Sequence, residues 1–401
     1  MTDFQEALMR LDLFITQKMR QHNVPAMSLG LTDDTHTLFS KAEGLADVGA
    51  RQPLVKQSLF QIGSIGKLFT AILVLQEVEN GTIDLHAPLN TYLEWFRVHS
   101  TFDEPITVHH LLTHTAGIIA GTDDTGEHRY EAYLLRHTHT GTPPGTYFHY
   151  SNIGYKILTA LLENVTGIAY GELVQARILD PLGMTNTLPV ITHHIRHRLA
   201  VGYTHLYDDR PPLPGYPFVP APWFEYGYGD GSIVSNASDM LIFLRCIINR
   251  GLADDGQAVI TDTSFDLITT AYTEAFGEHH YGYGVTISTF DDITHFGHGG
   301  NMLGYSSIML VDAINKLGVI VLANHAYCDL FSIADVALRL TRAAHAKQPL
   351  PKLPLIDEPS LIENATDFTG MFTASNGNTL SFIAEGRHLY LQLEAEDIQL
   401  F

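Results

Sequence analysis

Cysteine and basic residues are scarce in this chain. Its 401 residues include two cysteines, Cys246 and Cys328, which are too few for a disulfide framework and stand outside any metal-binding spacing. We expect both to be buried thiols. Lys and Arg total 23 against 44 Asp and Glu, which gives a formal net charge of −21. This acidic balance argues against nucleic acid and anionic membranes as partners.

Long apolar runs are also missing. No stretch approaches the roughly 20 apolar residues that a membrane-spanning helix requires. Residues 1–24 predict an amphipathic helix interrupted by charges, without the apolar core of a signal peptide. We therefore expect no membrane span and a cytoplasmic location for the sequence as given, although a chain trimmed of its signal would look the same. The sequence does not specify an oligomeric state.

Histidine, by contrast, is abundant, with 22 residues. The densest run, 193–198, lacks the H-E-x-x-H arrangement, and Arg196 and Arg198 would repel a cation. We predict no metal site and no cofactor.

The hydrophobic fraction of 45% is enough for a large core, in one large domain or two smaller ones. Near the N-terminus, 26–31 and 38–44 predict a strand hairpin, and the chain from about 68 to 240 is mostly helical. The C-terminal third changes to an antiparallel meander, followed by a helix over 332–344. Its predicted strands are 284–290, 294–297, 304–311 and 317–323.

Two irregular stretches interrupt this pattern. Residues 211–228 are dense in proline and aromatic residues, so we expect a loop, either over a pocket or packed on the surface. Residues 346–365 form a proline-rich linker. Beyond it, 366–401 predicts a small β segment with strands at 368–372, 379–384 and 388–393.

The most informative motif is Ser64-Ile65-Gly66-Lys67, at the start of an amphipathic helix that ends near Asn80-Gly81. A short strand-like run, 58–62, precedes it. The spacing puts a hydroxyl and an amine one helical turn apart, as a serine nucleophile with a lysine base requires. Backbone N–H groups of the first turn would stabilise an oxyanion. Alternatively, Ser64 is an N-cap and Lys67 a solvated residue.

A second motif, Tyr150-Ser151-Asn152, marks a turn into another helix. A phenol near an ammonium favours its ionised form, so Tyr150 could shuttle the serine proton. The amide of Asn152 could bind both Lys67 and a substrate carbonyl. In the alternative interpretation, Tyr150 is a core aromatic residue and Asn152 an N-cap.

The third motif is His298-Gly299-Gly300-Asn301, at the end of a meander strand. Its glycines would let a substrate lie along the strand edge, with the Asn301 N–H as a second oxyanion donor beside that of Ser64. His298 would project into the same cleft, to bind a substrate carboxylate or move protons. Alternatively, its ring lies in solvent.

Together these motifs resemble the serine β-lactamase and penicillin-binding-protein family, whose signature is S-x-x-K, then Y-x-N, then K/H-x-G in this order. The nearest branch comprises class C β-lactamases, D-alanyl-D-alanine carboxypeptidases, D-aminopeptidases and related esterases. Further matching stretches are 108–117, 181–184 and 231–235, and the resemblance covers roughly 5–345.

The resemblance implies an α/β (α+β) fold over 1–345, with an antiparallel sheet flanked by helices and a mostly helical lobe. It also implies acyl-enzyme chemistry in which Ser64 attacks a carbonyl and Lys67 and Tyr150 move the proton. Asn152, His298, Gly299, Gly300 and Asn301 would bind substrate. Residues 366–401 resemble part of the lipocalin-like barrel found in some peptidases of this family.

One departure concerns substrate. Class C β-lactamases usually carry lysine at the third motif, whereas histidine resembles the peptidase and D-amino-acid amidohydrolase branch. We therefore expect a serine hydrolase acting on peptides that contain D-amino acids. The alternatives are a β-lactamase or penicillin-binding protein, a carboxylesterase, and a catalytically silent scaffold.

Overall fold

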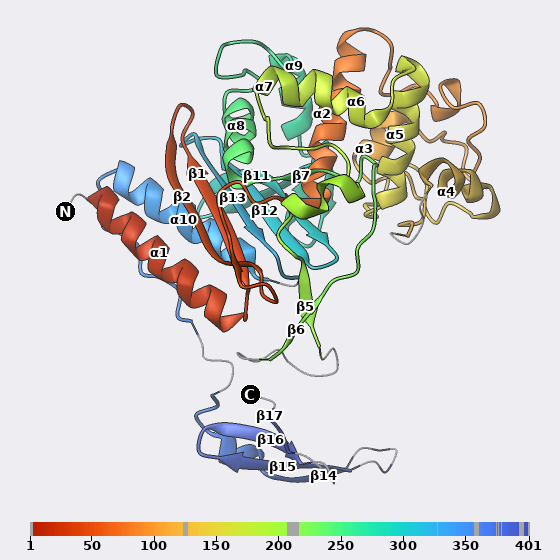
Figure 1. Cartoon of the computed structure of the whole chain (residues 1–401). Helices are drawn as coiled ribbons and strands as arrows, with labels where there is room; N and C mark the ends of the chain where they lie inside the picture. The colour runs from red at the N-terminus through yellow and green to blue at the C-terminus, as the bar shows by residue number, and fades with distance from the viewer. Residues whose placement is uncertain are drawn as a thin grey trace.

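The computed structural model describes residues 3–122, 127–206, 216–326, 328–356, 361–373, 375, 377, 379–392 and 397–399. Within them, the main feature is a nine-stranded antiparallel sheet that joins the two ends of the domain (Figure 1). The N-terminal strand β1 pairs with the late strand β13, with Leu29 opposite Val321. Across the sheet the order is β3 (Gln52–Pro53), β2 (Thr37–Asp47), β1 (Ala26–Thr32), β13 (Leu317–Ala323), β12 (Tyr305–Asp312), β11 (Ile293–Met302), β10 (Thr286–Phe290), β9 (His279–Tyr281) and β8 (Thr273–Ala275).

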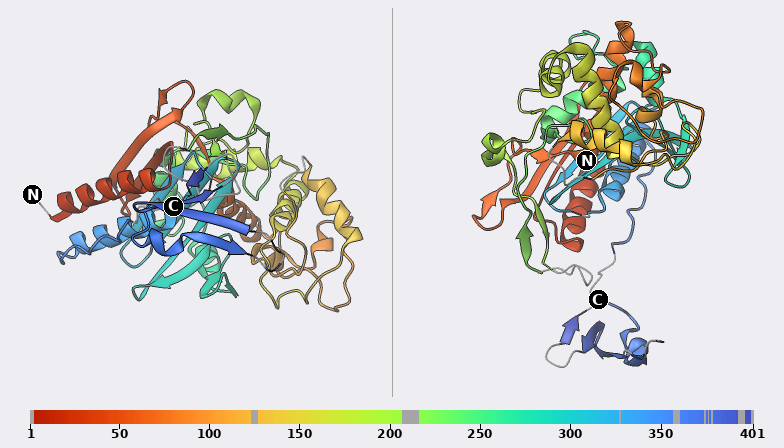
Figure 2. Two further views of the ribbon diagram at one scale, coloured as in Figure 1. Left: turned by 90° about the horizontal axis from the view of Figure 1, so that it is seen from below. Right: turned by 90° about the vertical axis from the view of Figure 1, so that its right-hand side faces the viewer.

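Helices cover both faces of this sheet. The helices α1 (Asp3–Gln21) and α10 (Leu330–His345) lie side by side on one face, and α8 (Ala237–Ile248) packs on the other (Figures 1 and 2). Strand β13 is buried throughout because its alternate residues serve the two layers. Val319 and Val321 join the core under α1 and α10, whereas Ile320 and Leu322 join the core under α8.

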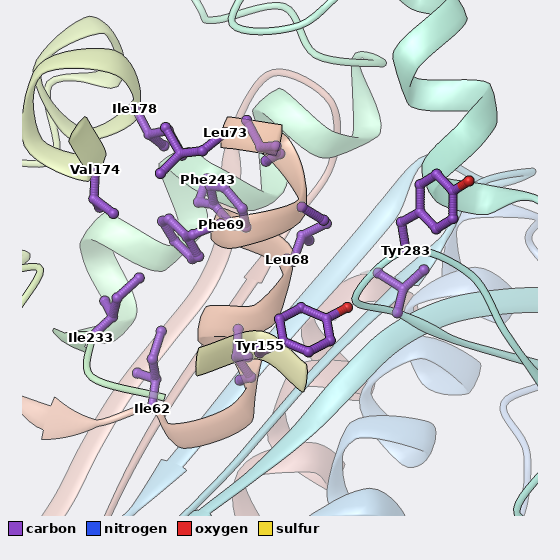
Figure 3. Packing of buried hydrophobic residues seen from close by; sticks show 14 of the residues in the cluster. Ile62, Leu68, Phe69, Leu73, Tyr155, Val174, Ile178, Ile233, Phe243 and Tyr283 are labelled. Carbon is purple, nitrogen blue, oxygen red and sulfur yellow. The ribbon is translucent and has the colours of Figure 1, made fainter. Parts of the chain in front are cut away.

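The second lobe is built around α2 (Gly66–Glu79), which is buried on nearly every side. The Phe69 ring stacks on that of Phe243 from α8, with centroids 4.1 Å apart (Figure 3). A helix this enclosed holds its first turn, and hence the residues around Ser64, in a fixed position. The other helices of the lobe are α3 (Val108–Leu112), α4 (His128–Leu134), α5 (Asn152–Thr166), α6 (Tyr170–Val174), α7 (Asp180–Leu182) and α9 (Asp262–Thr269).

Short elements connect these parts. The pairs are β4 (Phe60–Gln61) with β7 (Val234–Ser235), and β5 (Tyr203–His205) with β6 (Phe218–Pro220). The 3-10 helices are η1 (Gly63–Ile65), η2 (Leu89–Thr91), η3 (Leu135–His137), η5 (His193–Arg198) and η6 (Ala365–Phe368), and η4 (Gln175–Leu179) is a π-helix.

A separate four-stranded sheet follows the extended stretch after α10 (Figures 1 and 2). It contains β14 (Gly370–Thr373), β15 (Thr379–Glu385), β16 (His388–Gln392) and β17 (Asp397–Gln399). The barrel resemblance and the domain boundaries at 345 and 365 stay predictions.

The expected α/β fold with its helical lobe is confirmed, whereas several boundaries differ. Ser64 lies on the short 3-10 helix η1, and α2 begins only at Gly66. Within the stretch expected to be mostly helical, α6 passes into π-helical geometry at Gln175. Strands β8, β9 and the β5–β6 hairpin were not expected. Part of the loop expected over 211–228, residues 211–215, lies outside the described residues.

The burial of the two cysteines and the length of the helices test two further expectations. Cys246 is buried as expected, but Cys328 is only half-buried, and both thiols are free. In the described part of the chain, no single helix is long and apolar enough to cross a membrane. One pair, Asn152–Thr166 with Tyr170–Leu182, meets that criterion only jointly, by length and composition, and it is bent by 80°.

Candidate active site

Ser64 sits where the large sheet meets the helical lobe. Its 3-10 helix η1 follows β4 and lies against β11, which brings Gly63 next to Asn301. A Cβ atom on Gly63 would lie 2.9 Å from the Asn301 nitrogen, and Gly63 has a φ of +53°. Glycine is therefore required here, because a side chain would both clash and strain the backbone. Ser64 itself is half-buried and caps no helix.

Lys67 is fully buried and held by three acceptors. Its Nζ atom lies 3.1 Å from Ser64 Oγ, 2.8 Å from Asn152 Oδ1 and 2.7 Å from the backbone oxygen of Asp230. These three acceptors fix the position of the Lys67 nitrogen beside Ser64 Oγ. The interpretation of Lys67 as a solvated residue is therefore wrong, and its amine is within reach of the serine proton.

The second motif converges on the same amine. Ser151 is the N-cap of α5, because its side chain accepts a hydrogen bond from the Gly154 nitrogen, whereas the Asn152 side chain faces Lys67. Tyr150, half-buried, lies with its ring centre 5.0 Å from Lys67 Nζ. The alternative in which Asn152 caps the helix is therefore wrong. The Ser64 hydroxyl, the Asn152 amide and the Tyr150 ring therefore lie around the Lys67 amine.

The third motif lies in β11, which is longer than expected and continues to Met302. Strand β10 pairs with β11 only as far as Thr286 opposite Gly297, so the edge of β11 beyond Gly297 has no β10 partner. Along that edge Gly299 and Asn301 are exposed, and a Cβ on Gly300 would lie 2.0 Å from the Ile62 oxygen. The glycines therefore permit close approach of the Ser64 turn.

His298 is buried, contrary to the alternative that put its ring in solvent. Its Nδ1 donates to the Gly299 oxygen at 2.5 Å, so its Nε2 accepts from the Tyr281 hydroxyl at 3.0 Å. Burial, with the nearby Lys67 charge, lowers its pKa to about 4. The ring is therefore neutral and engaged at both nitrogens, and it presents no positive charge to a substrate carboxylate.

Several neighbours were not identified as site residues from sequence. The His114 ring lies 4.3 Å from that of Tyr150, and its Nδ1 accepts from the Ser151 nitrogen at 3.0 Å. Burial and the Lys67 charge hold the pKa of His114 well below its usual range. Tyr281 and Asp230 are likewise buried against the motif residues. His114 lies in a stretch that carried the family resemblance, which was the only sequence signal for any of these three.

Aromatic side chains line one side of Tyr150. The Phe276 ring lies 6.0 Å from that of Tyr150 and 5.0 Å from that of Phe148. Phe276 is 56% exposed and occupies a left-handed backbone conformation with φ of +50° in the turn after β8. An apolar surface therefore adjoins the phenol.

Within the described residues, no three His, Cys, Asp or Glu side chains cluster closely enough to hold a metal ion.

Comparison with known proteins identifies the family of this chain. The Beta-lactamase family model matches residues 11–342. Penicillin-binding protein 4 of Amycolatopsis lactamdurans is 29% identical over 307 residues, which are 73% of this chain and 78% of the relative. Esterase EstB of Burkholderia gladioli is 27% identical over 82% of this chain and 93% of its own length. A D-aminopeptidase of Cereibacter sphaeroides is 28% identical over 75% of this chain but only 57% of its own length.

Among solved structures, the octameric penicillin-binding protein homologue from Pyrococcus abyssi superposes with a TM-score of 0.76 at 26% identity. The match covers 98% of this chain and 89% of that one. The residues that the family model matches make up most of the chain and include the positions of all three motifs. The chain therefore belongs to the beta-lactamase family of serine hydrolases and penicillin-binding proteins.

Proposed function

We propose that this chain hydrolyses amides or esters of D-amino acids through an acyl-enzyme on Ser64. The observation that carries the proposal is the convergence of Ser64 Oγ, Asn152 Oδ1 and the Tyr150 ring on Lys67 Nζ. A buried amine 3.1 Å from a hydroxyl can accept its proton as the oxygen attacks a carbonyl.

The reaction proceeds in two halves. The Ser64 proton passes to the Lys67 amine while Oγ bonds to the substrate carbonyl carbon, and the backbone N–H groups of Ser64 and Asn301 stabilise the oxyanion. The bond to the leaving group then breaks, and that group takes a proton delivered through Tyr150. Water, activated by the same groups, adds to the acyl-enzyme and releases the acid and the free Ser64 hydroxyl.

The preference for D-amino-acid substrates rests on the third motif and on a relative. A neutral, buried His298 supplies no fixed positive charge for the carboxylate of a β-lactam or of a C-terminal residue. The D-aminopeptidase of Cereibacter sphaeroides shares 28% identity over 75% of this chain. These observations favour D-amino-acid amides and esters in which the group that His298 faces is not a carboxylate.

A substrate panel tests the proposal. The wild type and Ser64→Ala would be assayed on the p-nitroanilides and p-nitrophenyl esters of D-alanine and L-alanine. We expect turnover of the D series above the L series, and none by Ser64→Ala. Undiminished turnover by Ser64→Ala would refute the role of Ser64, and preference for L substrates would refute the stereochemical claim.

A second candidate is reaction with β-lactams, because Penicillin-binding protein 4 of Amycolatopsis lactamdurans shares 29% identity over 73% of this chain. Burst acylation by a chromogenic cephalosporin, faster than acylation by the D-alanyl ester, would favour it. A third is an esterase without amidase activity, which the similarity to EstB supports. Turnover of short acyl esters but of no amide would identify it.

A further inference from the structure

A buried carboxyl group stands behind the Lys67 amine. Asp230 is 4% exposed, and its backbone oxygen accepts from Lys67 Nζ at 2.7 Å. Its Oδ2 accepts from the Tyr226 hydroxyl at 2.7 Å, whereas its Oδ1 has no hydrogen-bond partner among the described residues. A carboxylate buried with one oxygen unsatisfied is costly unless positive charge lies close by.

Two cations lie near this carboxyl group. The first is Lys67, and the second is Lys156, which is also fully buried. Asn152 and Lys156 are one turn apart on α5, so the face of the helix that presents an amide to Lys67 also presents an ammonium. Lys156 Nζ binds Glu131 Oε2 at 2.7 Å and the Thr122 oxygen at 2.5 Å, and lies 5.7 Å from the Tyr226 ring centre.

Two buried cations therefore interact electrostatically with the Asp230 carboxylate. Both Lys67 and Lys156 oppose the rise in the Asp230 pKa that burial causes. Alternating charges extend from the candidate active site into the helical lobe, through Lys67, Asp230, Lys156 and Glu131. Such interactions are strong in a dry interior.

Resting on the proposed function, we propose that Asp230 and Lys156 are positioning residues that set the charge on the Lys67 base with opposite signs. The Asp230 carboxylate stabilises the ammonium form, and the Lys156 cation destabilises it.

The other titratable groups around this pair come from every surrounding element. His114 and His298, neutral through burial, face Lys67 from the α3 side and from β11. The tyrosines facing Lys67 or Asp230 are Tyr150, Tyr155, Tyr170, Tyr226 and Tyr228. Burial raises the pKa values of Tyr155, Tyr170 and Tyr228, so these three stay neutral.

The test measures the rate at which a fluorophosphonate probe labels Ser64 in the full chain between pH 5 and pH 10. With Asp230→Asn, we expect the acidic limb of this profile to shift to lower pH by about one unit. With Lys156→Met, we expect a shift to higher pH. Lys156→Arg, which keeps the charge, should restore the wild-type profile if it folds.

Matched controls separate charge from damage to the fold. Glu77→Gln removes a buried carboxylate at the end of α2 that is far from Lys67, where Glu77 pairs with Arg177. This variant should leave the acidic limb of the pH profile unchanged.

Thermal melting identifies variants that are unfolded. In that event the milder Tyr226→Phe replaces Asp230→Asn, and Lys156→Gln replaces Lys156→Met. Tyr226→Phe removes a hydrogen bond that stabilises the ionised form of Asp230, so it should shift the acidic limb to lower pH, in the same direction as Asp230→Asn.

The outcomes distinguish the two proposals. Shifts of opposite sign in Asp230→Asn and Lys156→Met support the inference, and no shift, or shifts of the same sign, overturns it. If the wild type itself is not labelled at Ser64, the proposed function fails instead.

Discussion

The Tyr281 hydroxyl lies 3.0 Å from Nε2 of His298, the residue that stands where related β-lactamases carry lysine. This contact and the Gly299 oxygen occupy both ring nitrogens, and burial lowers the pKa of His298 to about 4. His298 is therefore uncharged between pH 5 and pH 8. It shapes the edge of β11 without titrating in the working range.

The first prediction follows for His298→Gln. Glutamine keeps polar contacts at this position but cannot titrate, so the rate should fall moderately while the shape of the pH profile between pH 5 and pH 8 stays the same. The measurement is kcat/KM against pH for both proteins. A limb near pH 6.5 that disappears in the variant would show that a charged His298 takes part in the reaction.

The second prediction concerns Lys67→Met. Methionine has similar length and fills the site, but it cannot accept the Ser64 proton, so kcat/KM should fall by about 10²–10⁴-fold. It also leaves the Asn152 and Asp230 oxygens without their donor, which should lower the melting temperature. Activity within threefold of wild type would exclude Lys67 as the base.

The third prediction compares two neighbouring glycines. A Cβ on Gly300 would lie 2.0 Å from the Ile62 oxygen, whereas a Cβ on Gly299 would meet nothing closer than 3.8 Å. Gly300→Ala should therefore push β11 away from the Ser64 turn and destabilise the protein by about 3 kcal/mol. Gly299→Ala is the matched control for stability. Equal denaturation midpoints for the two variants would contradict the close approach of Ile62 to β11.

The fourth prediction is acid sensitivity. Burial lowers the pKa of His298 and of His325 from 6.5 to about 4, so each is neutral when folded but protonates when unfolded. The unfolded state binds more protons in this window, so stability is complete above pH 6.5 and falls as the pH drops toward 4. Below pH 4 both histidines are protonated in the folded and in the unfolded state, so they cause no further change in stability with pH.

His325→Gln tests this dependence. The variant lacks one of these histidines, so its free energy of unfolding should fall by about 2 kcal/mol less than that of wild type between pH 7 and pH 5. The exposed His36→Gln serves as control and should follow the wild type. Urea titrations at the two pH values supply the measurement. Identical pH dependence in all three proteins would contradict the buried, neutral state of His325.

The sequence predicted the parts of the site that depend on local spacing. Ser64 and Lys67 are three residues apart, so any helical turn brings them together, and Tyr150 and Asn152 are fixed by the start of α5. The apolar run 317–323 was likewise predicted as a strand of the meander, and it forms β13.

The partners that come from distant segments could not be predicted in the same way. Asp230 reaches Lys67 across 163 residues of sequence, and Tyr281 reaches His298 from the short strand β9. Nothing in the local pattern of these residues says which side chains they meet, because the fold alone determines the contact. The neutral state of His298 follows from the burial of its ring, which depends on these distant segments. Because the local sequence does not reveal this burial, we had expected an accessible ring.

The most direct test of the whole account is intact-mass and peptide analysis of the chain after brief exposure to a D-alanyl p-nitrophenyl ester and acid quench. We predict one added acyl group, located on Ser64, and none in Ser64→Ala. An acyl group on another residue, or full turnover by Ser64→Ala, would contradict the central claim that this serine is the nucleophile.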